Sequence, residues 1–215
     1  MRKKRNSGAA SFYAVPDMGP GHRGRVFRRL LAEAVKLVRR GHIPSVAEVA
    51  LAADVSRATA YRYFPSRSKL VSAVIAEALA PVRRAVPQSG EPKARLHELL
   101  DRTYSRFREY EPHMRAALQL ALEHQSLEAA GLLVEERFKR GQRIEILATT
   151  LSPLKTKLSK KSYQRLLQAL AVVYGIEPMI ILKDICGTSD RETETVVRWM
   201  MDALVDAALR DGNRN

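Results

Sequence analysis

Apolar residues recur along most of the chain at spacings of three and four positions, which is the period of an α-helix. No stretch alternates between apolar and polar residues in the way typical of a half-buried β-strand. The pattern therefore predicts an all-α fold. Helices are expected at about 24–40, 46–53, 57–64, 67–85, 93–109, 112–124, 127–150, 163–186 and 190–209.

The second and third of these helices are short and follow each other closely. Ser45 and Glu48 have the spacing of a capping box, so the first of the pair should begin at Val46. Asp54 occupies the turn, where a left-handed backbone is often needed and Asp tolerates it. Small residues on the inward face let a second helix cross closely. These are Val46, Val49, Ala50 and Ala53.

The next helix begins after the N-cap Ser56 and is stopped by Pro65. Ala60 and Phe64 should point inward. The other faces then carry small residues, hydroxyls and guanidinium groups, which suit close approach to a groove and hydrogen bonding to phosphates and base edges. These residues are Arg57, Ala58, Thr59, Tyr61, Arg62 and Tyr63. The pair predicts a DNA-binding helix-turn-helix.

Arg67 lies in the first turn of the following helix, where a cation is unfavourable for the helix dipole. A cation in this place suggests an external anion, such as a DNA phosphate.

These residues resemble the amino-terminal domain of the TetR family of one-component transcriptional regulators. The resemblance extends from Val26 to Ala76. It is carried by Gly41, Val49, Ala50, Ser56, Thr59, Tyr61, Phe64 and Arg67. The chain departs from the family at Asp54, where Gly is usual, and at Arg67, where Lys is usual. Arg keeps the charge for a phosphate and adds a bidentate option.

The resemblance implies a homodimer that binds a roughly palindromic double-stranded DNA operator. The expected effect of this binding is repression of transcription. Thr59, Tyr61 and Arg67 are assigned to phosphate positioning, and Ser45 and Ser56 to the two helix termini. The candidates for base contacts are Arg57, Ala58, Arg62 and Tyr63. Two alternatives stay open, a constitutive DNA-binding protein without an effector and a regulator controlled by a protein partner.

The charge distribution agrees with this interpretation. The chain has a net charge of +14. Residues 1–70 contain 15 Lys and Arg against 4 Asp and Glu, whereas residues 71–215 contain 22 against 19. An acidic membrane surface or RNA could also attract such a chain. The coincidence of the charge with a helix-turn-helix favours duplex DNA.

The amino-terminal residues 1–22 contain Gly, Pro and a basic cluster from Arg2 to Arg5, so a disordered arm is expected. It could lie on phosphates, enter a minor groove or remain a solvated tail. The segment lacks the continuous apolar stretch of a secretory signal. With the single Cys186 and no apolar run of ~20 residues, the sequence indicates a cytoplasmic protein without a membrane span.

Enzyme, metal and cofactor functions find no support in the sequence. The five His residues show no i, i+3 or i+4 pairing with another His, and no Cys or carboxylates cluster with them at metal-ligand spacing. The glycines of MGPGHRG lack the Lys and Ser or Thr of a phosphate loop. We therefore expect no catalytic activity, no metal and no cofactor.

The expected domains are the helix-turn-helix at 23–70 and a helical effector-binding and dimerisation domain at 71–210. The last helix carries Val196, Val197, Met200, Ala203, Leu204 and Ala207 at helical spacing, and Trp199 and Met201 widen this apolar belt. Two terminal helices with more apolar surface than one core needs predict a four-helix dimer interface. Packing of the extra surface inside one subunit is the alternative.

A small-molecule effector of unknown identity is implied by the resemblance. Residues expected around its cavity are Tyr104, Phe107, Met114, Leu118 and Phe138, although such residues at helical spacing also suit a core. Glu177 falls on an apolar stripe, and Pro178 is expected to bend that helix. Its carboxylate could face an effector, bind across the dimer interface or pair with an Arg of a neighbouring helix.

Overall fold

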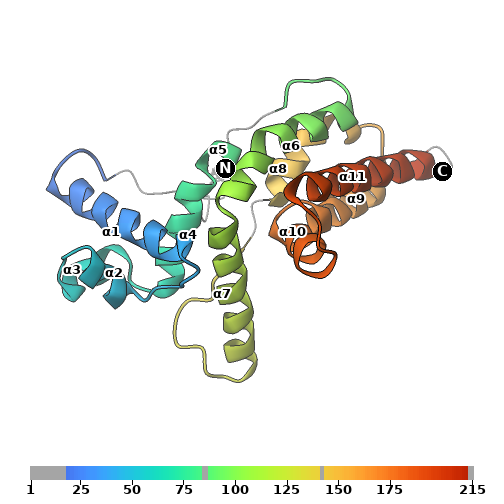
Figure 1. The fold of residues 1–215 in the computed structure, drawn as a ribbon. Helices are drawn as coiled ribbons and strands as arrows, with labels where there is room; N and C mark the ends of the chain where they lie inside the picture. The colour runs from blue at the N-terminus through green and yellow to red at the C-terminus, as the bar shows by residue number, and fades with distance from the viewer. Residues whose placement is uncertain (1–17, 84–86, 141–142, 213–215) are drawn as a thin grey trace, which may run out of the picture. The chain divides into compact units, whose positions relative to one another are not determined.

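The computed structural model describes residues 18–83, 87–140 and 143–212 (Figure 1). All regular elements in these ranges are helical, so the predicted all-α fold is confirmed for them. The basic cluster from Arg2 to Arg5 lies outside the described residues. In chain order the elements are α1 (His22–Arg39), α2 (Val46–Ala52), α3 (Arg57–Tyr63), α4 (Arg67–Ala78), α5 (Ala80–Arg83), α6 (Pro92–Glu109), α7 (Glu111–Ala129), α8 (Arg143–Thr150), η1 (Ser152–Leu154), α9 (Lys160–Val173), α10 (Ile176–Ile180), η2 (Ile181–Ile185) and α11 (Asp190–Gly212).

The chain packs into two compact units. Of the described residues, the amino-terminal unit contains 18–78 and 112–140, and the carboxy-terminal unit contains 79–83, 87–111 and 143–212. Most of α7 therefore packs with the helix-turn-helix, and His113 at its start hydrogen-bonds through Nε2 to the carbonyl oxygen of Val35 at 3.0 Å. The division into functional domains at residue 70 stays a prediction.

The core of the amino-terminal unit lies between α1, α2, α3 and α4. Leu30, Ala34 and Val38 of α1 are fully buried, as their spacing predicts. The Phe27 and Phe64 rings pack with centroids 5.3 Å apart, which fixes the end of α3 against the start of α1. The predicted stop at Gly41 is confirmed, since this residue follows the C-cap with φ of 81°.

The predicted helix over 127–150 is wrong. The helix α7 runs past residue 127, where the predicted helix was to begin, and ends at Ala129. Gly131 then adopts φ of 71°. The amide of Leu132 bonds to the carbonyl of Leu127 at 2.8 Å, the pattern of a Schellman motif. Residues 130–140 form a connection without regular structure, and α8 begins only at Arg143.

The predicted helix over 67–85 is also shorter than expected, because α4 ends at Ala78 and the separate α5 covers Ala80–Arg83. Pro81 has no amide hydrogen for the carbonyl of Glu77 and cannot continue the helix. The predicted end of the helix at residue 85 lies outside the described residues.

In the carboxy-terminal unit, α9 packs against α8 and α11, and α6 packs against α11. The expected bend at Pro178 is wrong: the helix breaks at Gly175, which has φ of 138°. A Cβ on Gly175 would lie 2.8 Å from the guanidinium carbon of Arg143, so this side chain fills the space beside the break. Pro178 is the third residue of α10, where a missing amide hydrogen costs nothing.

None of the described helices is, on its own, both long and apolar enough to cross a membrane. The segments Lys160–Val173 and Ile176–Ile185 pass that test only when joined across a bend of 42°, on length and composition alone.

Candidate nucleic-acid interface

The turn between α2 and α3 is built by local hydrogen bonds that the sequence predicts. The hydroxyl of Ser45 accepts from the amide of Glu48 at 3.2 Å, and the Glu48 carboxylate accepts from the amide of Ser45 at 2.7 Å. The predicted capping box is confirmed. Asp54 has φ of 48°, so the predicted left-handed turn is confirmed, and the amide of Val55 bonds back to Ala50 at 2.9 Å. These bonds fix the angle at which α3 leaves α2.

We expect Ser45→Ala to lower the free energy of unfolding by about 1 kcal/mol, because the amide of Glu48 loses its acceptor at the helix start. Chemical denaturation of both proteins at neutral pH measures this difference. Ser126→Ala is the control, since the exposed hydroxyl of Ser126 donates to the Leu122 carbonyl within α7 and caps no helix start. Equal losses in the two variants would contradict a capping role for Ser45.

The capping box also makes stability depend on pH. Hydrogen bonds from the amide and hydroxyl of Ser45 lower the pKa of Glu48 from 4.5 to about 2, and His42 adds a smaller effect in the same direction. A lowered pKa in the folded state means that ionised Glu48 stabilises the fold above pH 4.5, and that this stabilisation is lost as the pH falls towards 2.

At neutral pH we expect Glu48→Gln to lower the free energy of unfolding by about 0.5 to 1 kcal/mol. The expected effect is this small because the Glu48 carboxylate is half-exposed and therefore screened by solvent. The difference should shrink steadily below pH 4.5. Denaturation series at several pH values measure it, and a difference that grows on acidification would refute the assignment.

Most of the outward residues of α3 are open to solvent. Ser56, Arg57, Ala58, Tyr61 and Arg62 are exposed, with 47% of Tyr61 accessible. The helix carries no acidic residue. The small Ala58 near its first turn leaves the backbone approachable, and the five-residue spacing places Arg57 and Arg62 about 1.4 turns apart along the helix. The exposed surface of α3 is therefore cationic.

Thr59 and Tyr63 are less open than expected for DNA contacts. The Thr59 hydroxyl lies 2.9 Å from the Ser56 hydroxyl, which donates to it, and 3.2 Å from a guanidinium nitrogen of Arg62. The Tyr63 ring packs against Phe27 with centroids 6.2 Å apart and is partly buried in the core of the unit. Tyr63 therefore supports the position of α3 and presents only part of its ring.

Comparison with known families agrees with this geometry. The family described as bacterial regulatory proteins, tetR family, matches residues 30–74, which contain α2, α3 and most of α1 and α4. Residues 30–74 therefore form a TetR-type amino-terminal domain. No curated protein and no solved structure matches the chain. A TetR-type domain is a DNA-binding module of transcriptional regulators, so DNA binding is the activity that this match supports.

A second basic surface of the TetR-type domain was not predicted. The first two turns of α1 present four exposed arginines and no acidic residue. They are Arg23, Arg25, Arg28 and Arg29. Phe27, between them, packs on Phe64, so this end of α1 lies beside the end of α3. The signal in the sequence was the density of Arg ahead of the motif, which could have indicated a phosphate-contacting surface.

The structure gives Arg67 an internal partner where the sequence suggested an external anion. Its guanidinium pairs with Glu123 of α7, and its Nε lies 3.9 Å from Oε1 of Glu135 in the connection after α7. The other oxygen of Glu135 accepts from the amide of Ser68 at 3.1 Å and so caps α4. A carboxylate from residues 130–140 therefore supplies the negative charge at this helix start. A phosphate contact by Arg67 stays a prediction.

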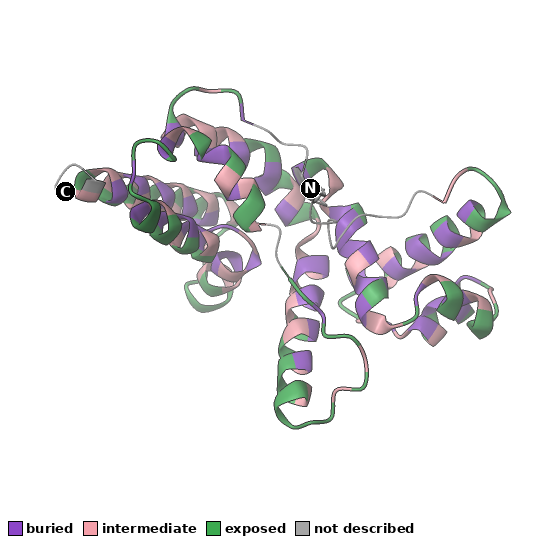
Figure 2. Ribbon diagram, turned by 180° about the vertical axis from the view of Figure 1, so that it is seen from behind, coloured by how far each residue is buried: buried purple, intermediate pink, exposed green. Residues whose placement is uncertain are grey.

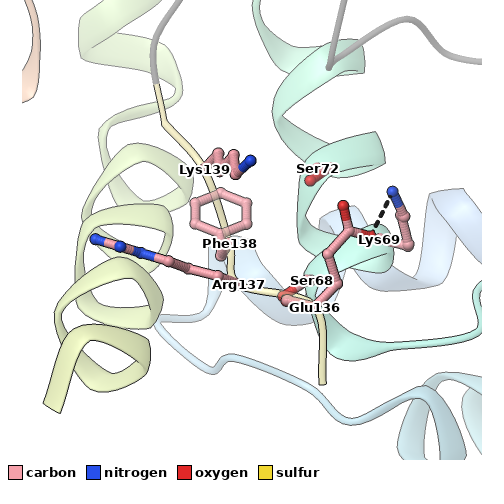
Figure 3. Close-up of a pocket in the computed structure, with 7 residues that line it drawn as sticks. All are labelled: Ser68, Lys69, Ser72, Glu136, Arg137, Phe138 and Lys139. Atoms are coloured by element: carbon pink, nitrogen blue, oxygen red, sulfur yellow. Dashed lines mark hydrogen bonds and ion pairs between the residues drawn. The ribbon is translucent and has the colours of Figure 1, made fainter. Parts of the chain in front are cut away.

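The six residues expected around an effector cavity fall in different units. Met114 is buried and Leu118 half-buried on α7, and Phe138 is buried in the connection after it, all in the amino-terminal unit. Phe138 lines a small cavity of this unit with Ser68, Lys69 and Ser72 of α4 and with Glu136, Arg137 and Lys139 (Figure 3).

The remaining three belong to the carboxy-terminal unit. Tyr104 and Phe107 are buried with ring centroids 6.4 Å apart, and Phe107 packs on Tyr174 at 5.4 Å. Glu177 pairs with Arg143 of α8 at 2.8 Å, which is one of the three roles that the sequence left open for it. Among the described residues, no group of three or more His, Cys, Asp or Glu side chains could hold a metal ion.

Proposed function

We propose that the protein is a homodimeric, sequence-specific transcriptional repressor that inserts α3 of each subunit into successive major grooves of a palindromic operator. The observation that carries the proposal is the exposed cationic side of α3, held in place by a capped turn in a TetR-type domain. A helix of this diameter fits the major groove of B-DNA.

In this proposal Arg57, Ala58 and Arg62 contact base edges. Tyr61 and the arginines of α1 contact phosphates, and Ser45 and Ser56 present their helix starts to the backbone. Tyr63 and Thr59 contribute with the parts of their side chains that remain accessible. A phosphate contact by Arg67 would compete with its carboxylate partners, Glu123 and Glu135.

The dimer is supported by the apolar residues that the carboxy-terminal unit leaves at its surface. In α11, Val197, Met201 and Val205 are buried in the unit, so a different side faces outward (Figure 2). Trp199 of α11 is 69% exposed, and Val172 of α9, the helix that packs against α11, is also 69% exposed. Ile181 and Ile185 of η2 are exposed as well. A second copy would cover these side chains in the predicted four-helix interface.

Selection of binding sites from a pool of random duplexes tests the proposed function. The purified protein should enrich one motif with two inverted half-sites about one helical turn apart. Enrichment of no motif, with equal binding to all duplexes, would favour the alternative of a constitutive DNA-binding protein with a small ratio of specific to non-specific affinity.

A small-molecule effector that releases the protein from DNA is a separate part of the proposal. Tyr104 is 3% exposed, and its hydroxyl has no hydrogen-bond partner among the described residues. Burial raises the pKa of Tyr104 well above its usual value, so the hydroxyl keeps its proton. An unpaired buried hydroxyl costs about 1 to 3 kcal/mol, which a polar ligand could recover. We propose that the protein acts in the cytoplasm. The effector part of the proposal fails if no compound or condition alters the occupancy of the operator.

A further inference from the structure

Arg67, at the start of α4, faces the carboxylates of Glu123 and Glu135. Only 28% of its side chain is exposed. Its guanidinium pairs with Glu123, whose side chain is 40% exposed, and faces Glu135 with Nε 3.9 Å from Oε1. A DNA phosphate that binds this guanidinium competes with the two carboxylates for its charge.

The carboxylate of Glu135 is held by contacts that do not depend on Arg67. Its Oε2 accepts from the amide of Ser68, and its Oε1 lies 3.2 Å from Nε2 of His124. His124 is fully buried, and its Nδ1 accepts from the amide of Phe138 at 3.0 Å, so this nitrogen carries no proton. The amide of Ser68 therefore remains a hydrogen-bond partner of Glu135 that does not involve Arg67.

The connection after α7 is fastened to α4 by a second set of bonds. The hydroxyl of Ser68 donates to the carbonyl of Glu136 at 2.8 Å, and Lys69 pairs with the carboxylate of Glu136 at 2.7 Å (Figure 3). Figure 3 shows the segment from Glu136 to Lys139 running beside the first turns of α4. These bonds keep the acidic residues beside the end of the helix-turn-helix.

The charges at this place do not favour a phosphate. One guanidinium faces two carboxylates, and His124 is uncharged in this hydrogen-bonding arrangement. The cluster of Arg67, Glu123 and Glu135 therefore carries an excess negative charge. A phosphate that approaches it is repelled by the carboxylates as well as attracted by the arginine.

We propose that Glu123 and Glu135 act as internal competitors of DNA phosphate for Arg67 and so limit the DNA affinity of the protein. The inference rests on the proposed function. It adds an autoinhibitory contact in which a part of the chain outside the helix-turn-helix holds a DNA-contacting side chain.

Glu123→Gln tests the inference in the full-length protein. Fluorescence anisotropy with a short mixed-sequence duplex, from about 50 to 200 mM salt, gives affinity and salt dependence. Glu123→Gln should bind about threefold to tenfold more tightly at the lower salt, with a steeper salt slope by up to about 0.9 per subunit. Glu128→Gln is the matched control, because it removes the same charge from α7 while its partner is Arg137 at 2.8 Å.

Two further variants decide the cause. In an Arg67→Ala background, Glu123→Gln should bring no gain beyond that of Glu128→Gln. Glu135→Gln, which keeps a carbonyl oxygen for the Ser68 amide, should also tighten binding, with thermal unfolding confirming that it folds. Equal gains in Glu123→Gln and Glu128→Gln, or a gain that persists without Arg67, would overturn the inference. No binding by wild type at any salt would instead overturn the proposed function, and the inference with it.

Discussion

Replacing both Arg57 and Arg62 by Ala is expected to abolish the preference of the protein for its operator. A bidentate contact from Arg to guanine contributes about 1 to 3 kcal/mol of discrimination, so two such contacts correspond to about 2 to 6 kcal/mol. Both side chains are exposed on α3, and Ala is already compatible with this helix, so folding should be retained. Anisotropy titrations with the selected operator and with a mixed-sequence duplex measure the loss.

The control variant replaces Lys160 and Lys161 by Ala. Both lysines are exposed at the start of α9 in the carboxy-terminal unit. It removes the same charge and should lower binding to both duplexes by a similar, small factor. The single variants should each relax the preference at a different operator position. If the double Arg variant kept the same ratio of operator to mixed-sequence affinity as wild type, base contacts by α3 would be refuted.

Replacing Trp199 by Arg is expected to convert the dimer to a monomer at micromolar concentrations. Buried Trp side chains in interfaces contribute about 2 to 4 kcal/mol, which corresponds to about thirtyfold to thousandfold in the dimer dissociation constant. Operator affinity should fall with it, because one subunit contacts a single half-site. Sedimentation equilibrium and operator titration on the same samples measure the two effects.

Val134→Arg serves as the control for this variant. Val134 is fully exposed in the connection after α7, which belongs to the amino-terminal unit. Its replacement by Arg therefore adds the same charge at an apolar surface position. It should leave the association state unchanged. A Trp199→Arg protein that stays dimeric, or a Val134→Arg protein that dissociates, would show that the exposed side of α11 is not the interface.

The sequence predicts well those features whose physical cause lies within a few residues. The capping box of Ser45 and Glu48, the left-handed Asp54 and the stop at Gly41 each depend on one or two side chains and their own backbone. Small buried residues such as Ala50 and Ala60 indicate that the helices cross closely. For this reason the helix-turn-helix was predictable in type, order and nearly in its boundaries.

Features that depend on distant residues were not predictable. The carboxylates around Arg67 come from α7 and from a connection that the helical pattern concealed. Gly131 carried the local signal for the end of α7, but apolar residues on both sides of it suggested a continuous helix. The break at Gly175 needs the side chain of Arg143 to fill the adjacent space, which no local pattern shows.

The side of α11 that faces the core is a further example. Two apolar sides lie close together on this helix, and the sequence pattern grouped Val196 and Met200 with Val197. Packing buries Val197, Met201 and Val205, whereas Trp199 stays exposed. Which side packs within the subunit depends on neighbouring helices, so periodicity alone could not separate a core from an interface.

Hydroxyl-radical footprinting of the selected operator, in excess mixed-sequence competitor at physiological salt, tests the central claim most directly. The account predicts protection in two inverted half-sites about one helical turn apart, present with wild type and absent with the double Arg57 and Arg62 variant. Protection without dyad symmetry, or a footprint that the double variant retains, would contradict a dimer that recognises DNA through α3.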